Sequence, residues 1–300
     1  MTFRQFSGIV ELRTKIVSVS TYTVSLLYAL WIRGAVSPVR AVLVFLAALA
    51  VDMGTTGFNS YFDWYRNVDD PKFNREEAKV LVHQGLSPGT AFWVSLVCFA
   101  VAALLGLVLT VMVGPWVIVL GTLSLLVGFL YSGGPRPISA TPWGEFFSGG
   151  FLGTVFFFIN VYILTGTLSL TAALVSLPQS FAIAAILAVN NASDMEGDRA
   201  AGRRTLALVV GKAKAPWVVY ALVFLALGSL TVLSFLGPLP RPLGITAILS
   251  GIPIFLELRR LHRRGYTHDT KVPNMGSISK IFLLFSSAEL IGLALAFVIG

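Results

Sequence analysis

Two clusters of carboxylate and amide side chains are the residues of this chain best suited to chemistry, because its 300 residues include only 14 acidic ones. The first cluster comprises Asn59, Asp63, Asp69 and Asp70, and the second comprises Asn190, Asn191, Asp194 and Asp198. The spacing of three or four residues in the second cluster would present an amide and two carboxylates on one helical face. Such oxygen ligands suit Mg²⁺, which usually also binds a substrate phosphate. The two clusters therefore predict a diphosphate held by metal between two half-sites.

The acidic residue that acts together with Asp63 is left open by the sequence. If the helix continued, Asp70 would return to the face of Asp63 and Asp69 would lie to one side. Pro71, however, disfavours a helical conformation at the residue before it. Asp69 and Asp70 both remain candidate ligands. The structural alternative is that these carboxylates cap a helix and pair with nearby basic residues.

Basic residues accompany the second cluster, since Arg199, Arg203 and Arg204 follow Asp198 within six positions. Arginine binds phosphate through paired hydrogen bonds, while metal-linked carboxylates neutralise and orient the same group. Taken alone, Arg203 or Arg204 is explained equally well as one of the basic residues that mark the cytoplasmic side of a membrane protein. Acidic and basic residues together predict a diphosphate site.

A glycine- and proline-rich stretch from Tyr131 to Glu145 contains Arg136 and separates two apolar runs. Such a loop can bring backbone N–H groups and the Tyr131 hydroxyl close to a ligand. The alternative is a simple helix break at a membrane exit. Asp52 lies within an apolar run, seven residues before Asn59, and is expected either to line the acceptor end of a cavity or to have a structural partner.

The elements that carry these residues are predicted to be membrane-spanning helices. The chain is 56% hydrophobic and 12% charged, with a mean hydropathy of +0.81. Its apolar runs are long enough to cross a bilayer and lack the alternation of barrel strands. We expect an all-α bundle forming a single domain over residues 1–300. The nine expected spans are 15–33, 38–62, 90–113, 115–132, 145–165, 170–193, 215–236, 241–258 and 279–299.

The basic residues predict the orientation of these spans. Nineteen of the 22 Lys and Arg residues fall on one side, which by the positive-inside rule is the cytoplasm and the side of the N-terminus. The net charge of +8 is thereby explained by topology and by attraction to anionic lipid headgroups, so no nucleic-acid partner is expected. The first residues lack the pattern of a cleaved signal peptide and predict a short interfacial helix.

The complete pattern resembles the UbiA superfamily of intramembrane prenyltransferases, and within it the 1,4-dihydroxy-2-naphthoate polyprenyltransferases of menaquinone biosynthesis. The resemblance covers nearly the whole chain. It rests on Asn59-x-Tyr-x-Asp63, on Tyr131-x-Gly-Gly-Pro-x-Pro, and most specifically on the string from Asn190 to Gly211. Ser60 stands where the family usually has aspartate, Asn67 where glycine is common and Arg203 where lysine is common.

The resemblance implies nine helices around a central cavity, in a multi-pass protein of the cell membrane whose active site faces the cytoplasm. It implies Mg²⁺-dependent transfer of a polyprenyl group from a polyprenyl diphosphate to an aromatic acceptor, here 1,4-dihydroxy-2-naphthoate. The implied catalytic residues are Asp63, Asp194, Asp198, Asn59 and Asn191, and the metal ligands are Asp63, Asp69 or Asp70, Asp194 and Asp198. The candidate diphosphate-binding residues are Asn59, Arg66, Lys72, Tyr131, Arg136, Asn190, Asn191, Arg199 and Arg203.

Other functions were weighed against this one. Within the class, the acceptor could instead be 4-hydroxybenzoate, homogentisate, haem or a glycerol phosphate lipid. A transporter of an anionic phosphorylated metabolite would need polar groups toward both membrane faces, whereas the clusters here are confined to one. A CDP-alcohol phosphotransferase would gather its acidic residues in one short motif, and here they are divided between two distant segments.

Overall fold

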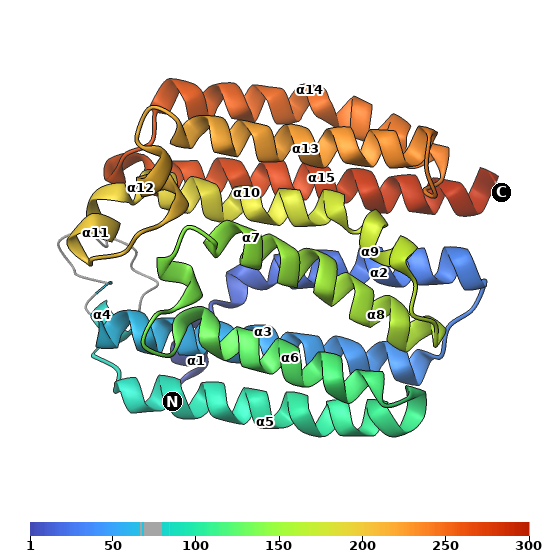
Figure 1. The fold of residues 1–300 in the computed structure, drawn as a ribbon, viewed down its shortest axis with the longest axis horizontal. Helices are drawn as coiled ribbons and strands as arrows, with labels where there is room; N and C mark the ends of the chain where they lie inside the picture. Colours follow the sequence, from blue (N-terminus) through green and yellow to red (C-terminus); the bar gives the residue numbers. More distant parts are fainter. Residues whose placement is uncertain (67, 69–79, 84, 300) are drawn as a thin grey trace. The chain divides into compact units, whose positions relative to one another are not determined.

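The computed structural model describes residues 1–66, 68, 80–83 and 85–299, and within them every regular element is helical (Figure 1). Three candidate site residues, Asp69, Asp70 and Lys72, lie outside the described residues. The chain divides into two compact units. The first consists of Met1–Val19, Val39–Thr141 and Glu196–Arg204, and the second of Ser20–Pro38, Pro142–Met195 and Thr205–Gly300.

The described residues include eight helices that are long and apolar enough to cross a membrane. A further apolar helix, α6 (Trp116–Ser132), has 17 residues, which is at the lower limit of the roughly 17 to 25 that span a bilayer. These helices confirm the expected all-helical membrane bundle, with eight candidate spans and the shorter α6 among the described residues. The short helix expected near the N-terminus is α1 (Phe3–Ile9).

The expected bounds were wrong at the end of the chain. Helix α14 (Arg241–Arg264) continues past residue 258, and α15 (Lys271–Ile299) begins well before residue 279. The connection is therefore a short turn containing η4 (His268–Thr270), rather than a loop of about twenty residues. Charged residues had suggested a loop, but a helix tolerates them where it leaves the hydrocarbon region.

In the first unit, aromatic packing positions helix α3 (Pro38–Tyr65), which carries the first cluster. The Phe58 ring lies 5.6 Å and 5.1 Å, centroid to centroid, from Phe92 and Phe99 on α5 (Pro88–Val113). It also lies 5.3 Å from Phe129 on α6, in an edge-on arrangement like the other two pairs. Edge-on contacts favour one relative orientation of the rings. They fix the rotation of α3 at the residue before Asn59.

The first unit also contains short elements around these helices. Helix α1 packs with α4 (Val80–His83) in a small core that includes Ile9, Val10 and Leu81. The remaining elements are η1 (Leu12–Lys15), the start of α2 (Ile16–Arg33), η2 (Ile138–Ala140) and most of α11 (Met195–Ala200).

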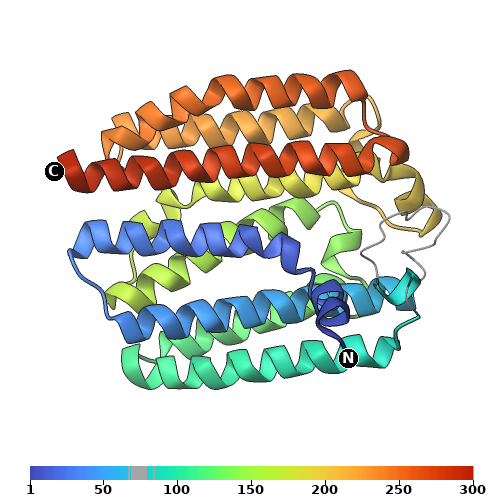
Figure 2. The ribbon, with the colours of Figure 1, turned by 180° about the vertical axis from the view of Figure 1, so that it is seen from behind.

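In the second unit, helix α10 (Leu177–Ser193) carries part of the second cluster and lies beside α13 (Ala215–Phe235) and α15, while α14 packs against these two helices (Figures 1 and 2). It is approached closely by α7 (Gly144–Gly149) and by η3 (Gly150–Val155), a π-helical segment. A Cβ atom added at Gly153 would lie 2.5 Å from the Ser180 Cα atom. Small residues of this kind permit tight helix packing in membranes.

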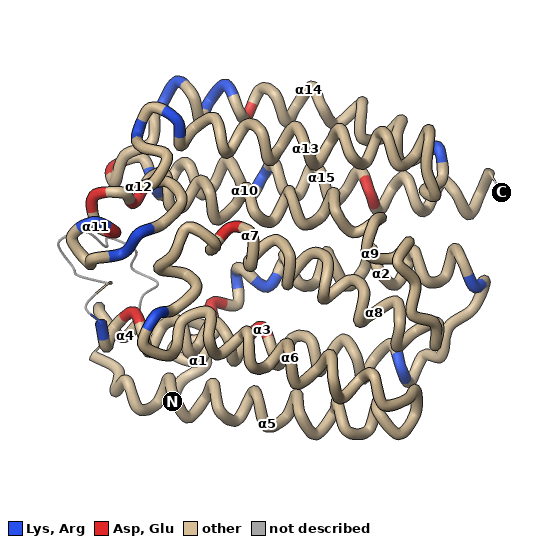
Figure 3. Tube along the Cα trace, viewed as in Figure 1, with Lys and Arg blue, Asp and Glu red and all other residues tan. Residues whose placement is uncertain are grey.

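The other elements of the second unit are α8 (Phe156–Thr165), α9 (Leu170–Val175) and α12 (Leu206–Val210). Charged residues in each unit gather mainly at one end of its helices (Figure 3). The long apolar stretches of the same helices have few charges, as a hydrocarbon environment requires.

Candidate functional site

The two central residues of the first cluster, Asn59 and Asp63, contact each other on α3. The Asn59 amide nitrogen donates to an Asp63 carboxylate oxygen at 2.8 Å, and the Ser132 hydroxyl donates to the Asn59 amide oxygen at 2.8 Å. Residues four apart on a helix lie one above the other, which accounts for the first contact. Ser132, at the end of α6, was not predicted, and it fixes which way the Asn59 amide points.

Arg66 lies one turn beyond Asp63 and binds backbone carbonyl groups. Its guanidinium donates to the carbonyl oxygens of Ser132 and Gly134, and its Cζ atom lies 5.1 Å from the centroid of the Phe62 ring. The predicted phosphate ligand therefore anchors the start of the glycine- and proline-rich loop. Tyr131, in the last turn of α6, is partly buried, and Arg136, in the loop, is exposed.

Ser60, the departure from the usual first motif, is buried at 5% exposure and donates to the Ile9 carbonyl oxygen at 3.2 Å. It therefore packs against the end of α1. Asp52, farther along α3, has the structural partner that was one of its two alternatives. Lys15 contacts Asp52 Oδ1 at 2.7 Å, and the Ser18 hydroxyl donates to Asp52 Oδ2 at 2.6 Å.

The second cluster does not lie on one continuous helix, so that expectation was wrong. Helix α10 ends at Ser193, Asp194 follows with φ −108° and ψ 12°, and α11 begins at Met195. The interruption places Asp194 in the second unit and Asp198 in the first. Periodicity alone could not reveal it, because no glycine or proline marks the break.

In the first unit, Asp198 is 3% exposed and forms an ion pair with Arg203 at 3.2 Å. Arg203 also donates to the Ser139 carbonyl oxygen at 2.8 Å, and the Arg204 backbone N–H donates to the Ala140 carbonyl oxygen at 2.9 Å. Gly202 has φ +70°, a conformation that favours glycine and lets the chain turn back after α11. Arg199, by contrast, is exposed.

In the second unit, the buried Asn191 donates to Glu145 Oε1 at 2.9 Å, whereas Asn190 is partly buried. Asp194 has two basic neighbours that sequence reasoning missed. Lys271 Nζ lies 2.8 Å from Asp194 Oδ2, and His268 Nδ1 lies 3.7 Å from Asp194 Oδ1. A contact across 77 residues leaves no local sequence signal.

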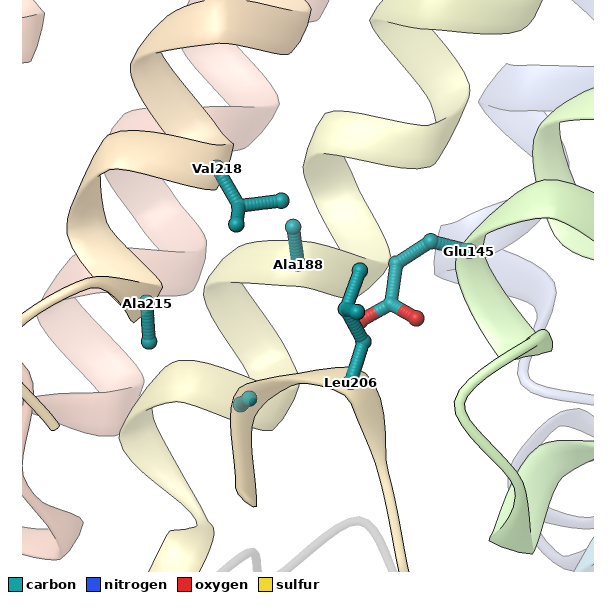
Figure 4. Close-up of a pocket in the computed structure, with 6 residues that line it drawn as sticks. Glu145, Ala188, Leu206, Ala215 and Val218 are labelled. Atoms are coloured by element: carbon teal, nitrogen blue, oxygen red, sulfur yellow. The ribbon is translucent and has the colours of Figure 1, made fainter. Parts of the chain in front are cut away.

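The pocket shown in Figure 4 lies in the second unit and is lined by Glu145, Ala188, Leu206, Ala207, Ala215 and Val218. It contains about 160 Å³ of empty space. This is smaller than the roughly 300 to 1,000 Å³ of most small-molecule sites. We therefore do not assign it to a substrate. Its one charged residue is Glu145, the partner of Asn191.

Tyr266, in the turn between α14 and η4, has a buried hydroxyl group. Burial, and next the neighbouring Tyr220, raise the pKa of Tyr266 well above its ordinary value. Its hydroxyl group therefore keeps its proton at neutral pH.

The donor chemistry of the clusters fits Mg²⁺, because it consists of carboxylate and amide oxygens. Among the described residues no group of three or more His, Cys, Asp or Glu side chains is arranged to hold a metal ion. Mg²⁺ often has few protein ligands and takes the rest from water and phosphate, so an incomplete set suits it better than it suits zinc.

The helical bundle and these oxygen-rich, basic clusters define a multi-pass membrane protein with polar sites near the ends of its helices. Residues 18–284 match the model of the UbiA prenyltransferase family. The chain belongs to this family, whose members are prenyltransferase enzymes.

Several relatives carry names that describe an activity. The 1,4-dihydroxy-2-naphthoate octaprenyltransferase of Bacillus subtilis is 35% identical over 173 residues, which cover 56% of this chain and about half (55%) of that relative. The protein of the same name from Mycobacterium tuberculosis is 27% identical, covering 87% of this chain and 86% of its own. A digeranylgeranylglyceryl phosphate synthase of Thermococcus kodakarensis is 28% identical, covering 59% of each chain.

The fold is similar to that of a UbiA homologue from Archaeoglobus fulgidus whose structure was determined with GPP and Mg²⁺. The two chains have a TM-score of 0.65 and 15% sequence identity, with 97% of this chain and 99% of the other covered. At this identity the likeness shows a shared fold.

Proposed function

We propose that this protein is a Mg²⁺-dependent prenyltransferase that transfers a polyprenyl group from its diphosphate to 1,4-dihydroxy-2-naphthoate, forming demethylmenaquinol, the hydroquinone of demethylmenaquinone. The observation that carries the proposal is the pairing of each carboxylate in the second cluster with a cation, Asp198 with Arg203 and Asp194 with Lys271. Alternating acidic and basic groups suit a ligand made of a metal ion and a diphosphate. The family match supports the same reaction class.

In this proposal Asp63, Asp194 and Asp198 are the described metal ligands, and Asp69 or Asp70 completes the set. Asn59 and Asn191 assist through their amide groups, and each amide is already oriented by a hydrogen bond, to Ser132 and Glu145 respectively. Mg²⁺, when bound, would neutralise the charge that develops on the leaving diphosphate. The family match spans residues of both compact units and supports one functional domain over the whole chain.

The chain's own basic residues would bind the diphosphate and stabilise it as it leaves. The allylic C–O bond breaks, and its electron pair goes to the diphosphate. With dihydroxynaphthoate, the ring carbon that bears the carboxylate then bonds to the allylic cation. The bond from that carbon to the carboxylate breaks, its electron pair returns to the ring, and carbon dioxide leaves. Apolar and aromatic side chains, such as the buried Phe157, would shield the cation from water.

The acceptor is proposed from relatives. Two of the relatives described above are named for dihydroxynaphthoate, and one of them matches 87% of this chain. The Thermococcus kodakarensis relative, named for a glycerol phosphate lipid, matches 59% of the chain. We also propose that the protein lies in the cell membrane. Its site and its N-terminus would face the cytoplasm, the side on which 19 of the 22 basic residues are expected.

A panel of acceptors tests this proposal. Membranes containing the protein would be incubated with radiolabelled polyprenyl diphosphate and Mg²⁺, together with dihydroxynaphthoate, 4-hydroxybenzoate, homogentisate, haem or a glycerol phosphate lipid. We expect labelled demethylmenaquinol, or its oxidation product demethylmenaquinone, and we expect loss of the label from both when Mg²⁺ is chelated. Transfer to none of the acceptors would reject the prenyltransferase assignment. Transfer only to another acceptor would reject dihydroxynaphthoate.

A further inference from the structure

Lys271 is the first residue of α15, and its side chain ends at the carboxylate of Asp194. The Lys271 side chain is 9% exposed and that of Asp194 is 21% exposed. The lysine of this ion pair is thus shielded from solvent, whereas the carboxylate is partly accessible. His268, at 3.7 Å from the other carboxylate oxygen, makes Asp194 the meeting point of two basic side chains.

The turn that carries Lys271 is tied down by several hydrogen bonds. Thr267 and Thr270 form a capping box around η4, and the Asn274 amide donates to the Gly265 carbonyl oxygen at 2.9 Å. These bonds fix the backbone on either side of Lys271. The long, flexible stem of a lysine still lets its ammonium group change partners without movement of the backbone.

We propose that Lys271 has two successive partners: Asp194 in the protein without substrate, and the diphosphate once substrate is bound. This inference rests on the proposed function. A buried ammonium group needs a counter-charge, and Asp194 supplies it in the free protein. Any ligand that reaches Asp194 also approaches Lys271 Nζ, which lies 2.8 Å from the carboxylate. An arriving phosphate oxygen therefore becomes a second acceptor for the same ammonium group.

If Lys271 has these two partners, removing its charge changes the affinity for a divalent cation and the affinity for a diphosphate in opposite directions. Without Lys271 the ammonium group at 2.8 Å no longer competes with a divalent cation for Asp194, so binding of the cation alone becomes tighter. Binding of a diphosphate becomes weaker, because one charge-assisted hydrogen bond is lost. A residue with a purely structural role would weaken both.

The experiment measures both affinities on the purified full-length protein in detergent. Binding of Mn²⁺ alone would be followed by electron paramagnetic resonance, and binding of inorganic pyrophosphate in excess Mg²⁺ by calorimetry. For Lys271→Met we expect Mn²⁺ to bind about three- to tenfold more tightly, and pyrophosphate about tenfold more weakly. Lys280→Met is the matched control, since Lys280 is an exposed lysine on the same helix, and both of its affinities should equal those of the wild type.

Lys271→Gln provides a second neutral variant that still donates a hydrogen bond, and it should show the same pair of shifts if the methionine variant does not fold. Unchanged affinities, or parallel weakening of both in a folded variant, would overturn the role of Lys271. If the wild type binds neither Mn²⁺ nor pyrophosphate, the proposed metal–diphosphate site itself is wrong. The two failures are therefore distinguishable.

Discussion

At the scale of single residues, the carboxylates of this protein are held by specific donors. Asp63 accepts from Asn59, Asp194 from Lys271, and Asp52 from Lys15 and Ser18. A charged group that leaves water needs such compensation. The same contacts orient the carboxylates before a ligand arrives, which reduces the reorganisation needed on binding.

Asp63→Ala and Asp194→Ala should each lower prenyl transfer by about 100-fold or more. Each substitution removes a carboxylate that would hold Mg²⁺, and Mg²⁺ would neutralise the charge that develops on the leaving diphosphate. Transfer would be measured with radiolabelled donor on membranes containing equal amounts of protein. Glu196→Ala is the control, because Glu196 is exposed and lies two residues from Asp194. Near-normal turnover in either aspartate variant would show that the metal ligands are misassigned.

Lys15→Met should destabilise the protein by about 3 kcal/mol, because it leaves the Asp52 charge without its cation in a membrane-spanning helix. The double variant Lys15→Met/Asp52→Leu should regain much of the stability that Lys15→Met loses. The measurement is the thermal unfolding midpoint in detergent, with Arg4→Met as a control at an exposed position. A double variant less stable than Lys15→Met would contradict this account of the pair.

At the scale of helices, close packing controls how the polar residues are presented. The Phe58 ring fixes the rotation of α3 beside Asn59. In the second unit, Gly149 and Gly153 bring α7 and η3 against α10, the helix that ends just before Asp194. In a membrane such contacts replace the hydrophobic effect as the source of helix association.

Gly153→Ala should destabilise the protein by about 1 to 3 kcal/mol, since the added Cβ would lie 2.3 Å from Ser180 Oγ and 2.5 Å from its Cα. Gly150→Ala is the matched control, because it lies in the same π-helical segment and its Cβ would meet no atom within 4 Å. The thermal midpoint in detergent distinguishes the two. Full rescue by Ser180→Ala would contradict the argument, since backbone atoms form part of the clash.

At the scale of the whole molecule, the distribution of basic residues and the number of spans predict the arrangement across the membrane. Eight described helices are long enough to span, and α6 is a shorter ninth. If α6 also crosses the membrane, the number of spans is odd and the two ends of the chain lie on opposite sides. The proposed cytoplasmic N-terminus then requires the end after α15 to lie outside.

A reporter fused after residue 300 and expressed in bacteria tests this orientation. Alkaline phosphatase, which is active only outside the cytoplasm, should be active, and green fluorescent protein exported in the same position should be dark. Fusions at Lys212, in the basic stretch before α13, should show the reverse pattern. A fluorescent fusion at the C-terminus would mean that one predicted helix does not cross the membrane.

The sequence predicted the helices well because each span must be a long apolar run, whose ends are marked by charge, glycine or proline. Its assignment of polar residues to a metal and diphosphate site stays a prediction. It did not predict Lys271 or Ser132, because their partners lie 77 and 73 residues away. Nor did it predict the break at Asp194, although Ser193 and Asp194 are weak helix formers that favour helix ends.

The contact of Gly153 with Ser180 has a practical consequence for handling this protein. Its tightness comes from backbone and small side chains in van der Waals contact, so it involves no lipid molecule. Exchanging the bilayer for a detergent micelle leaves such a contact intact, whereas a contact mediated by lipid tails would loosen. The part of α10 that leads to Asp194 should therefore survive extraction, and purified protein is a fair object for the binding measurements.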